Sequence, residues 1–403
     1  MKKVMNISLF LITSVVFLSG GNVLSKNITV DDAESRMEYL EKARSWSKDI
    51  RPNQITLEGP KQKKKWRQFS YNEMIECSFQ EPDVKDPPNG KTPKFWCVDD
   101  NGKSFKVKYE NLDTGERNDG VFGEILSTRL FWMLGFPSDA TYPVRINCAN
   151  CPEKPWDYLL GFFAKDKQDQ GGNISSRQKR YIRELSQPRV QNLIIDNAVI
   201  EIKAPYDEIE MTPHQGWSWK EFKSLLTEQN SYRVQHEALA LLAAFIQHAD
   251  NKPEQQRLVC LDDDRKKGEQ CSNTMIMIQD LGFSFGHGYI EGQRSTSTAS
   301  LNGFVKAPIW SDKDNCITKI NYYKWTGEDA DVQISEAGRK FLSDLLQQLT
   351  DDDLVNLFVP ARLYLKPEFI NIAGQERPVT IMDWTKAFKD KITEISSHSC
   401  PVR

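Results

Sequence analysis

The sequence has few of the features that mark the common classes of hydrolase. It contains no G-x-S-x-G, no H-E-x-x-H and no cysteine–histidine pairing with the local context of a catalytic thiol. Histidine is scarce, and the spacing of the five that occur matches no set of metal ligands: His214, His236, His248, His287 and His398. A hydrolase with a serine or cysteine nucleophile or a histidine-bound metal is therefore disfavoured.

The chain also lacks an excess of positive charge. It carries 53 lysines and arginines against 56 aspartates and glutamates, a formal net charge of −3. A mildly acidic protein has no general attraction to nucleic acid, so no nucleic-acid partner is expected. The one dense basic run, Lys61 to Arg67, could touch a phosphate or a membrane surface, but it is more typical of a solvated loop.

Long hydrophobic runs are absent after the N-terminus. Residues 1–21 combine two early lysines, an apolar stretch from Val4 to Leu18 and small residues up to Gly21, the plan of a signal peptide. An uncleaved anchor is the alternative, but polar residues interrupt the short apolar stretch and favour cleavage, near Gly21 or Ser25. We therefore expect an exported protein, periplasmic or extracellular, with no transmembrane anchor after cleavage.

Eight cysteines form an even set in a chain that is expected to be exported. In an oxidising compartment they predict up to four disulfides. Pairing of neighbours, with the last pair assigned by elimination, predicts Cys77–Cys97, Cys148–Cys151, Cys260–Cys271 and Cys316–Cys400. The C-x-x-C at 148–151 has no second copy and no nearby histidine, so a local disulfide is the simpler interpretation.

The length predicts two lobes, because about 380 residues exceed what one compact core usually holds. We expect an α+β protein in which an N-terminal extension, 22–70, carries a helix between Asp31 and Ile50. A small β-rich lobe is predicted for 71–165 and a larger helical lobe for 166–403. The polar stretch from Lys165 to Lys179 is interpreted as the lobe junction or a mobile loop.

Strand patterns and one helix define the small lobe. Strands are predicted at 74–79, 94–98 and 104–109. A helix from Gly120 to Leu134 follows, ending at a glycine stop. On the third strand, Lys106 and Lys108 face the same side because side chains alternate, so the sequence alone cannot choose between them as a partner for Glu124 on the helix.

The larger lobe is predicted to contain a buried helix and two acidic loops. The helix, capped by Ser231 and running to about His248, is too apolar for a surface element. It leads into His248-Ala249-Asp250-Asn251-Lys252-Pro253-Glu254-Gln255. An apolar strand at 274–278 leads into the second loop, Asp280-Leu281-Gly282.

In this order, the two loops resemble H-R-D-x-K-P-x-N and D-F-G of the protein-kinase-like superfamily. The run from Asp280 to Gly286 is more similar to its divergent branches: phosphoinositide kinases, HipA-type toxin kinases, secretory-pathway kinases and exported bacterial kinase-like proteins. The motif-bearing part extends from about residue 71 to 290. The resemblance implies a bilobal fold, with one key helix in the small β-rich lobe and a larger helical lobe.

For the small lobe, the resemblance implies a lysine that contacts the α- and β-phosphates of ATP and a glutamate that orients it. Lys108 is preferred over Lys106, because Val107-Lys108 resembles the end of the V-A-I-K strand. Glu124 is the matching glutamate. The loop from Pro82 to Thr92 lacks G-x-G-x-x-G, so any cover over the phosphates is formed without the usual glycine spacing.

For the larger lobe, the resemblance implies that Asp250 orients the acceptor hydroxyl and that Lys252 neutralises charge on the transferring group. Asp280 would bind Mg²⁺ or Mn²⁺. Gln255 stands where the family has a metal-binding asparagine, and its extra methylene puts the second metal and turnover in doubt. His248 is interpreted as structural.

The leading hypothesis is an exported kinase-like phosphotransferase that moves the γ-phosphate of ATP to a hydroxyl of a protein, lipid or sugar, using Mg²⁺ or Mn²⁺. The alternative is a pseudokinase that binds nucleotide or serves as a scaffold without turnover. A third hypothesis is nucleotidyl transfer from ATP bound in reverse.

Overall fold

The computed structural model describes most of the chain after the predicted signal peptide. The signal peptide at 1–21 and the basic run Lys61–Arg67 lie outside the described residues. These are 28–30, 33–47, 55–56, 59–60, 69–85, 87, 90, 92–204, 206–210, 216–262, 269–286, 298–320, 330–372 and 374–402.

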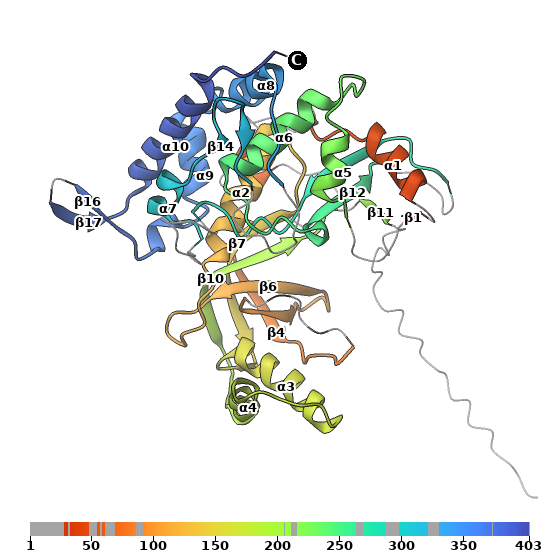
Figure 1. Ribbon diagram of the computed structural model, residues 1–403. Coiled ribbons are helices and arrows are strands. Elements are labelled where there is room, and N and C mark those ends of the chain that lie inside the picture. The colour runs from red at the N-terminus through yellow and green to blue at the C-terminus, as the bar shows by residue number, and fades with distance from the viewer. Residues whose placement is uncertain are drawn as a thin grey trace, which may run out of the picture.

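Five strands of the small lobe close into a barrel in the order β10-β6-β5-β4-β7 (Figure 1). Neighbouring strands are antiparallel except β4 and β7, which are parallel. Alternate side chains, such as Val107, Tyr109, Val144 and Ile146, are buried in its interior. The strands are β4 Met74–Phe79, β5 Lys94–Val98, β6 Ser104–Glu110, β7 Ala140–Ala149 and β10 Leu193–Ile202.

Helix α2, Gly120–Leu134, has the predicted bounds and is buried along almost its whole length. It ends at Gly135, whose φ of 83° is the left-handed conformation that glycine adopts without steric cost. Gly123 brings α2 close to the second acidic loop, since a Cβ there would lie 2.5 Å from the carbonyl oxygen of Gly282. The helix can therefore carry Glu124 into the space between the lobes.

A helical insertion between β7 and β10 changes the predicted lobe boundary. Helices α3, Pro155–Asp169, and α4, Ser176–Arg183, project from the barrel away from the larger lobe (Figure 1). The predicted boundary at residue 165 falls inside α3, and β10, which lies beyond it, completes the barrel. We propose the segment after β10, rather than the polar stretch 165–179, as the connection between the lobes.

A four-stranded sheet of order β1-β11-β12-β13 lies at the base of the larger lobe. The second acidic loop of the larger lobe, Asp280-Leu281-Gly282, follows β13 after one residue. Strand β13 has the predicted bounds. The strands are β1 Ile28–Thr29, β11 Asp207–Glu210, β12 Gln256–Cys260 and β13 Thr274–Ile278.

Helix α1, Ala33–Lys42, is shorter than the helix predicted between Asp31 and Ile50. The chain leaves the helix because the backbone of Arg44 pairs with the free edge of β13. Its N–H donates to the carbonyl oxygen of Thr274 at 3.1 Å, and it accepts from the N–H of Ile276 at 2.9 Å. Satisfying a buried strand edge outweighs one further helical turn.

Helix α6, Arg233–Phe245, is the buried helix that the sequence predicts, with every residue from His236 onward buried. Its N-cap is Tyr232 without a side-chain hydrogen bond, so the predicted cap at Ser231 is wrong. The helix ends before His248, because Gln247 adopts a positive φ of 58° and turns the chain. His248 is then fully buried, and the following residues reach the space between the lobes.

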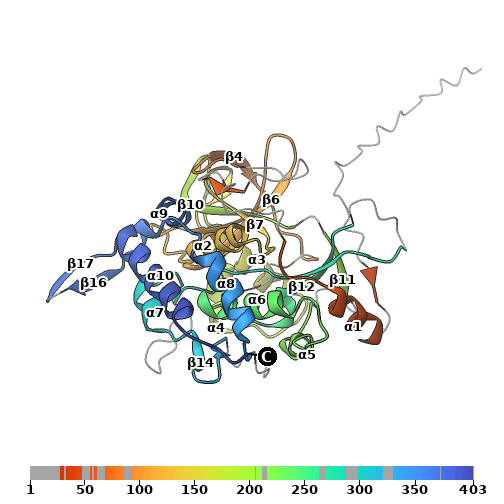
Figure 2. The same ribbon diagram turned by 90° about the horizontal axis from the view of Figure 1, so that it is seen from above.

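The remaining elements complete a helical lobe around α6. Figures 1 and 2 place α1 and the β16–β17 hairpin at opposite ends of this lobe. The α+β, two-lobed architecture is therefore confirmed.

No helix among the described residues has the length and apolar character needed to cross a bilayer. The further helices are α5 Trp219–Ser224, α7 Leu301–Lys306, α8 Glu336–Leu346, α9 Asp351–Phe358 and α10 Ile381–Ser396. The further strands are β2 Ile55–Thr56, β3 Gly59–Pro60, β8 Cys151–Pro152, β9 Arg189–Val190, β14 Trp310–Asp312, β15 Ile317–Thr318, β16 Phe369–Ile372 and β17 Gln375–Pro378.

One buried guanidinium links the two lobes. Arg362 follows α9, has a φ of 54° and is 1% exposed. It donates to the side-chain oxygens of Asn72 and Asn197 and to the carbonyl oxygens of Val144 and Ala198, at distances up to 3.3 Å. All four acceptors belong to the small lobe, so this arginine helps to set the angle between the lobes.

All eight cysteines are paired as predicted, and none is free. The pair Cys260–Cys271 joins the ends of β12 and β13 and brackets the segment between the two acidic loops. The pair Cys316–Cys400 closes the longest loop, with a sequence separation of 84, and ties the C-terminus to the larger lobe. Its sequence separation makes this pair the strongest constraint on the unfolded chain.

Candidate functional site

A lysine–glutamate pair lies at the face of the small lobe that looks toward the larger lobe. Lys108 on β6 and Glu124 on α2 meet at 2.6 Å between Nζ and Oε1, and both are buried. Lys106 points to the same side, as alternation requires, but it pairs with Glu201 at 3.0 Å instead. The structure therefore separates two lysines that the sequence left as alternatives.

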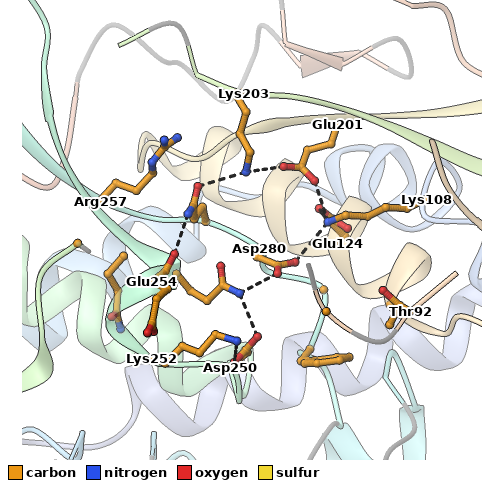
Figure 3. Close-up of a pocket in the computed structure, with 18 of the residues that line it drawn as sticks. Thr92, Lys108, Glu124, Glu201, Lys203, Asp250, Lys252, Glu254, Arg257 and Asp280 are labelled. Carbon is orange, nitrogen blue, oxygen red and sulfur yellow. Dashed lines mark hydrogen bonds and ion pairs between the residues drawn. The ribbon is translucent and has the colours of Figure 1, made fainter. Parts of the chain in front are cut away.

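Glu201 on β10 is a central residue of the site that sequence reasoning missed. Its carboxylate lies 2.8 Å from Lys108, 3.0 Å from Lys106 and 2.5 Å from Lys203, as Figure 3 shows for Lys108 and Lys203. One signal could have revealed it: Glu201 and Lys203 alternate with an apolar residue directly after the apolar run Ala198-Val199-Ile200. It was overlooked because β10 lies beyond the predicted small-lobe boundary.

Asp139 extends the ion-pair network beyond Glu201, because Lys203 contacts both carboxylates. It follows α2 and accepts from Lys203 Nζ at 2.8 Å and from the backbone N–H of Ala204 at 2.9 Å. Arg257 approaches it at 4.0 Å and pairs with Glu208 on β11. The ion pairs thus extend from β6 through β10 to the sheet of the larger lobe.

Three residues of the first acidic loop face the same space. Asp250 Oδ1 lies 3.2 Å from Lys252 Nζ. Gln255 ends a short 3-10 helix, Pro253–Gln255, and its Nε2 donates to Asp250 Oδ2 at 3.1 Å and to Asp280 Oδ2 at 2.8 Å. The predicted residues of the two acidic loops are therefore joined through the amide of Gln255.

Asp280 lies where the two halves of the site meet. It follows β13 with a positive φ of 49°, a conformation that aspartate tolerates better than most residues. Besides Gln255, it contacts Lys108, with 3.3 Å between Oδ1 and Nζ. The two loops are also joined through their backbones, because the N–H of Ala249 donates to the carbonyl oxygen of Phe283 at 2.9 Å.

These residues line a cavity of about 810 Å³, which is in the range of small-molecule sites. Gly90 and Thr92, from the loop predicted to cover phosphates, contribute to its wall. Lys94 on β5 also lines it and lies directly opposite Lys108 on β6. Because these two buried lysines lie opposite each other on neighbouring strands, their positive charges repel. An anion bound in the cavity would reduce this repulsion.

Mutual pairing keeps Lys108 and Glu201 charged, whereas burial brings the pKa of Glu124 close to neutral pH. Burial alone would lower the pKa of Lys108, but the surrounding carboxylates outweigh it and raise the pKa well above the usual value. Burial would raise the pKa of Glu201, yet the three lysines hold it well below its usual range. Burial, with Glu201 nearby, raises the pKa of Glu124 to about 7, although Lys108 opposes the shift.

The acidic loops show opposite shifts. Burial raises the pKa of Asp250, and the charge of Asp280 adds to this effect. Burial also acts to raise the pKa of Asp280, but the lysines of the small lobe, Lys108 first, lower it to about 2. On β5, burial and then the charges of Lys108 and Lys106 lower the pKa of Lys94 to about 8. Asp250 is thus the carboxylate better suited to accept a proton, and Asp280 the one that stays ionised.

The donor set partly fits a divalent cation. Two carboxylates, Asp250 and Asp280, offer the hard oxygen atoms that Mg²⁺ and Mn²⁺ prefer. Gln255, however, presents its amide nitrogen rather than its oxygen to both of them. Among the described residues, the groups of three or more close metal-ligand side chains all contain disulfide cysteines and lie elsewhere. The residues present therefore fit a cation at Asp280 when the side-chain amide of Gln255 rotates, so that its oxygen rather than its nitrogen faces the two carboxylates.

Two kinases are among the solved structures that this chain resembles. The chain is similar in structure to the proinflammatory kinase CtkA of Helicobacter pylori, at 12% identity and a TM-score of 0.33, over 80% of this chain and 94% of that one. It is also similar to the Golgi casein kinase with Mn and ADP bound, at 9% identity and a TM-score of 0.33, over 81% of this chain and 72% of that one. No protein-family model matches the sequence, and no curated protein does. Overlap at this level assigns neither an activity nor a residue role.

Proposed function

We propose that the protein is a kinase-like phosphotransferase that moves the γ-phosphate of ATP to a hydroxyl acceptor in the cavity between the lobes. One observation carries the proposal. The Lys108–Glu124 pair lies within 3.3 Å of Asp280, which is joined through Gln255 to Asp250 and Lys252. Residues from a strand, a helix and two loops thus meet, and their charges and positions support phosphoryl transfer.

The small lobe would bind and orient the phosphates of ATP. Lys108 would contact them while Glu124 and Glu201 hold its ammonium group in place. Lys106 and Lys94 line the same wall and would add positive charge. These groups act by position and charge and form no covalent intermediate.

The larger lobe would supply the chemistry of the acceptor. The acceptor oxygen would form a bond to the γ-phosphorus, the bond from that phosphorus to the bridging oxygen would break, and ADP would leave. Asp250 would take the hydroxyl proton, for which its raised pKa is suited, and Lys252 would neutralise charge on the transferring group.

Asp280 would hold Mg²⁺ or Mn²⁺, with Gln255 as a second ligand after its amide turns. The cation would neutralise the charge that develops on the phosphate oxygens during transfer. Asp280 is held ionised by the neighbouring lysines, which suits it to this role. Because three carboxylates surround Lys108, nucleotide binding should depend strongly on the cation.

One observation favours a second candidate, a nucleotide-binding module without turnover. The amide nitrogen of Gln255 lies between the carboxylates of Asp250 and Asp280 and donates to both. If the amide keeps this orientation, a cation cannot bridge toward Asp250. Nucleotide could then bind through the small lobe while transfer fails.

We also propose that the protein works outside the cytoplasm. Four disulfides that use all eight cysteines support this, because such bonds persist in oxidising compartments and are rare in the cytosol. The predicted signal peptide at 1–21 agrees with this location.

A thermal-shift titration with ATP and Mg²⁺ or Mn²⁺ tests the nucleotide site, with Asp280→Ala as the deciding variant. Ligand at about 100 times its dissociation constant should stabilise the wild type by about 2.7 kcal/mol. Asp280→Ala should lose the cation-dependent part entirely. Asp344→Ala, at an exposed position on α8, is the matched control and should behave as the wild type.

Transfer itself is tested with γ-labelled ATP and the mass of the labelled product. A phosphate on the product supports the phosphotransferase, whereas an added AMP would identify nucleotidyl transfer. A cation-dependent thermal shift without any product would favour the binding module. No shift with either cation would refute the nucleotide site.

A further inference from the structure

Gln255 is held firmly at its backbone, while its side chain spans two carboxylates. Its N–H donates to the carbonyl oxygen of Lys252 at 2.9 Å, and its own carbonyl accepts from the N–H of Gln279 at 2.8 Å. Pro253 restricts the turn that precedes it. With its backbone held in this way, Gln255 can change its contacts by rotation about its side-chain bonds.

The two hydrogens of one amide group are shared between two aspartates. Nε2 lies 3.1 Å from Asp250 Oδ2 and 2.8 Å from Asp280 Oδ2. The other oxygen of each carboxylate faces a lysine, Lys252 and Lys108 respectively. The amide nitrogen therefore lies between two negative groups, on the side of each carboxylate that its lysine does not contact.

A divalent cation would use the same two oxygens. Between these oxygens, it would meet the partly positive NH₂ group of Gln255. Half a turn of the amide replaces the nitrogen by Oε1, which two carboxylates repel unless a cation lies among them. The orientation of the amide and the presence of the cation are thus linked by electrostatics.

We infer that Gln255 is a two-position residue: its Nε2 holds Asp250 and Asp280 together in the cation-free protein, and its Oε1 turns inward as a ligand when a divalent cation binds. Asparagine at this place would be shorter by one methylene and would span the two carboxylates less well. Gln255 would in this way keep the cation-free site assembled. The inference rests on the proposed function for the identity of the site, but it concerns the cation alone.

Cation binding without nucleotide is the first test. Mn²⁺ affinity is measured by electron paramagnetic resonance for the wild type, Gln255→Glu and Gln255→Leu. Glutamate cannot donate and adds a negative ligand, so Gln255→Glu should bind Mn²⁺ about tenfold more tightly. In the absence of cation, both variants should have a lower melting temperature than the wild type, because the two aspartates lose their bridge. Gln348→Leu, at an exposed glutamine just after the end of α8, is the matched control for both measurements.

The amide itself is observed by NMR on protein labelled with ¹⁵N-glutamine, with Mg²⁺ as the diamagnetic probe. The Gln255 side-chain signals are identified by their loss in Gln255→Leu. They should shift on titration, with the midpoint that cation binding shows. If the cation binds and these signals stay unchanged, or if Gln255→Glu binds no tighter, the two-position role is overturned and the proposed phosphotransferase is untouched. If no divalent cation binds with or without ATP, both proposals fall.

Discussion

The two halves of the cavity are built differently. In the small-lobe half, two buried groups have several charged partners each: Lys108 contacts three carboxylates, and Glu201 contacts three lysines. In the larger-lobe half, Lys252 contacts Asp250 alone among the ion pairs of the described residues, and 35% of its side chain is exposed. The small-lobe half is therefore preorganised by its strands, whereas the larger-lobe half can adjust when ligands arrive.

Replacing the central lysine tests this difference most directly. Lys108→Met should lower the free energy of unfolding by about 3 to 5 kcal/mol, because it leaves buried Glu124 without its cation. Lys252→Met removes a half-exposed ion pair and should cost about 1 kcal/mol or less. Urea denaturation of both variants measures the two values.

Lys106→Met is the matched control for Lys108→Met, since it lies on the same strand face. Glu201 keeps Lys108 and Lys203 as partners after this change, so a small loss is expected. Equal losses for Lys106→Met and Lys108→Met would contradict the central place of Lys108 in the ion-pair network.

The two aspartates should show opposite pH dependence of stability. The pKa of Asp280 is lower in the folded protein, about 2, than in the unfolded chain, so its contribution is present above about pH 4 and is lost as the pH falls toward 2. The pKa of Asp250 is raised by folding, so its ionised form lowers stability at neutral pH. At pH 7, Asp280→Asn should destabilise the protein and Asp250→Asn should stabilise it.

The effect of Asp280→Asn should be about 1 kcal/mol or less, because 40% of the Asp280 side chain is exposed and solvent screens its charge. Urea denaturation at pH 7, 5 and 3 separates it from the effect of Asp250→Asn. Below about pH 3, the Asp250→Asn variant should lose its advantage, since the wild-type group is then protonated in both states. If both variants changed the free energy of unfolding in the same direction at pH 7, the predicted contrast between the two aspartates would be wrong.

The smallest effect is expected at Lys94, where like charges face each other across β5 and β6. Lys94→Met should raise the melting temperature of the ligand-free protein slightly, because it removes repulsion from Lys108. Under the proposed function, the same change should weaken the stabilisation by ATP and cation. Lys103→Met, at an exposed turn position, is the control, and a lower ligand-free melting temperature for Lys94→Met would count against repulsion.

Local patterns were enough to predict much of the scaffold. The alternation of β4, β5 and β6, the apolar face and glycine stop of α2, and the spacing of neighbouring cysteines are short-range signals. The strand and helix patterns are read within a few residues, so no knowledge of the folded chain is needed. The last cysteine pair, Cys316–Cys400, followed by elimination once the neighbouring cysteines were paired. The sequence by itself therefore determined the lobes in outline, the four disulfides and the order of the two acidic loops.

Tertiary structure decided what long-range pairing controls. Only closure of the barrel brings β10 beside β6, and with it Glu201 beside Lys108, although the two residues are far apart in sequence. The choice between Lys106 and Lys108 depended on where α2 packs, because alternation puts both lysines on one face. The direction of the Gln255 amide depended on two aspartates 5 and 25 residues away along the chain. Burial and charge pairing act between segments that only the fold brings together, so residue types alone could not specify them.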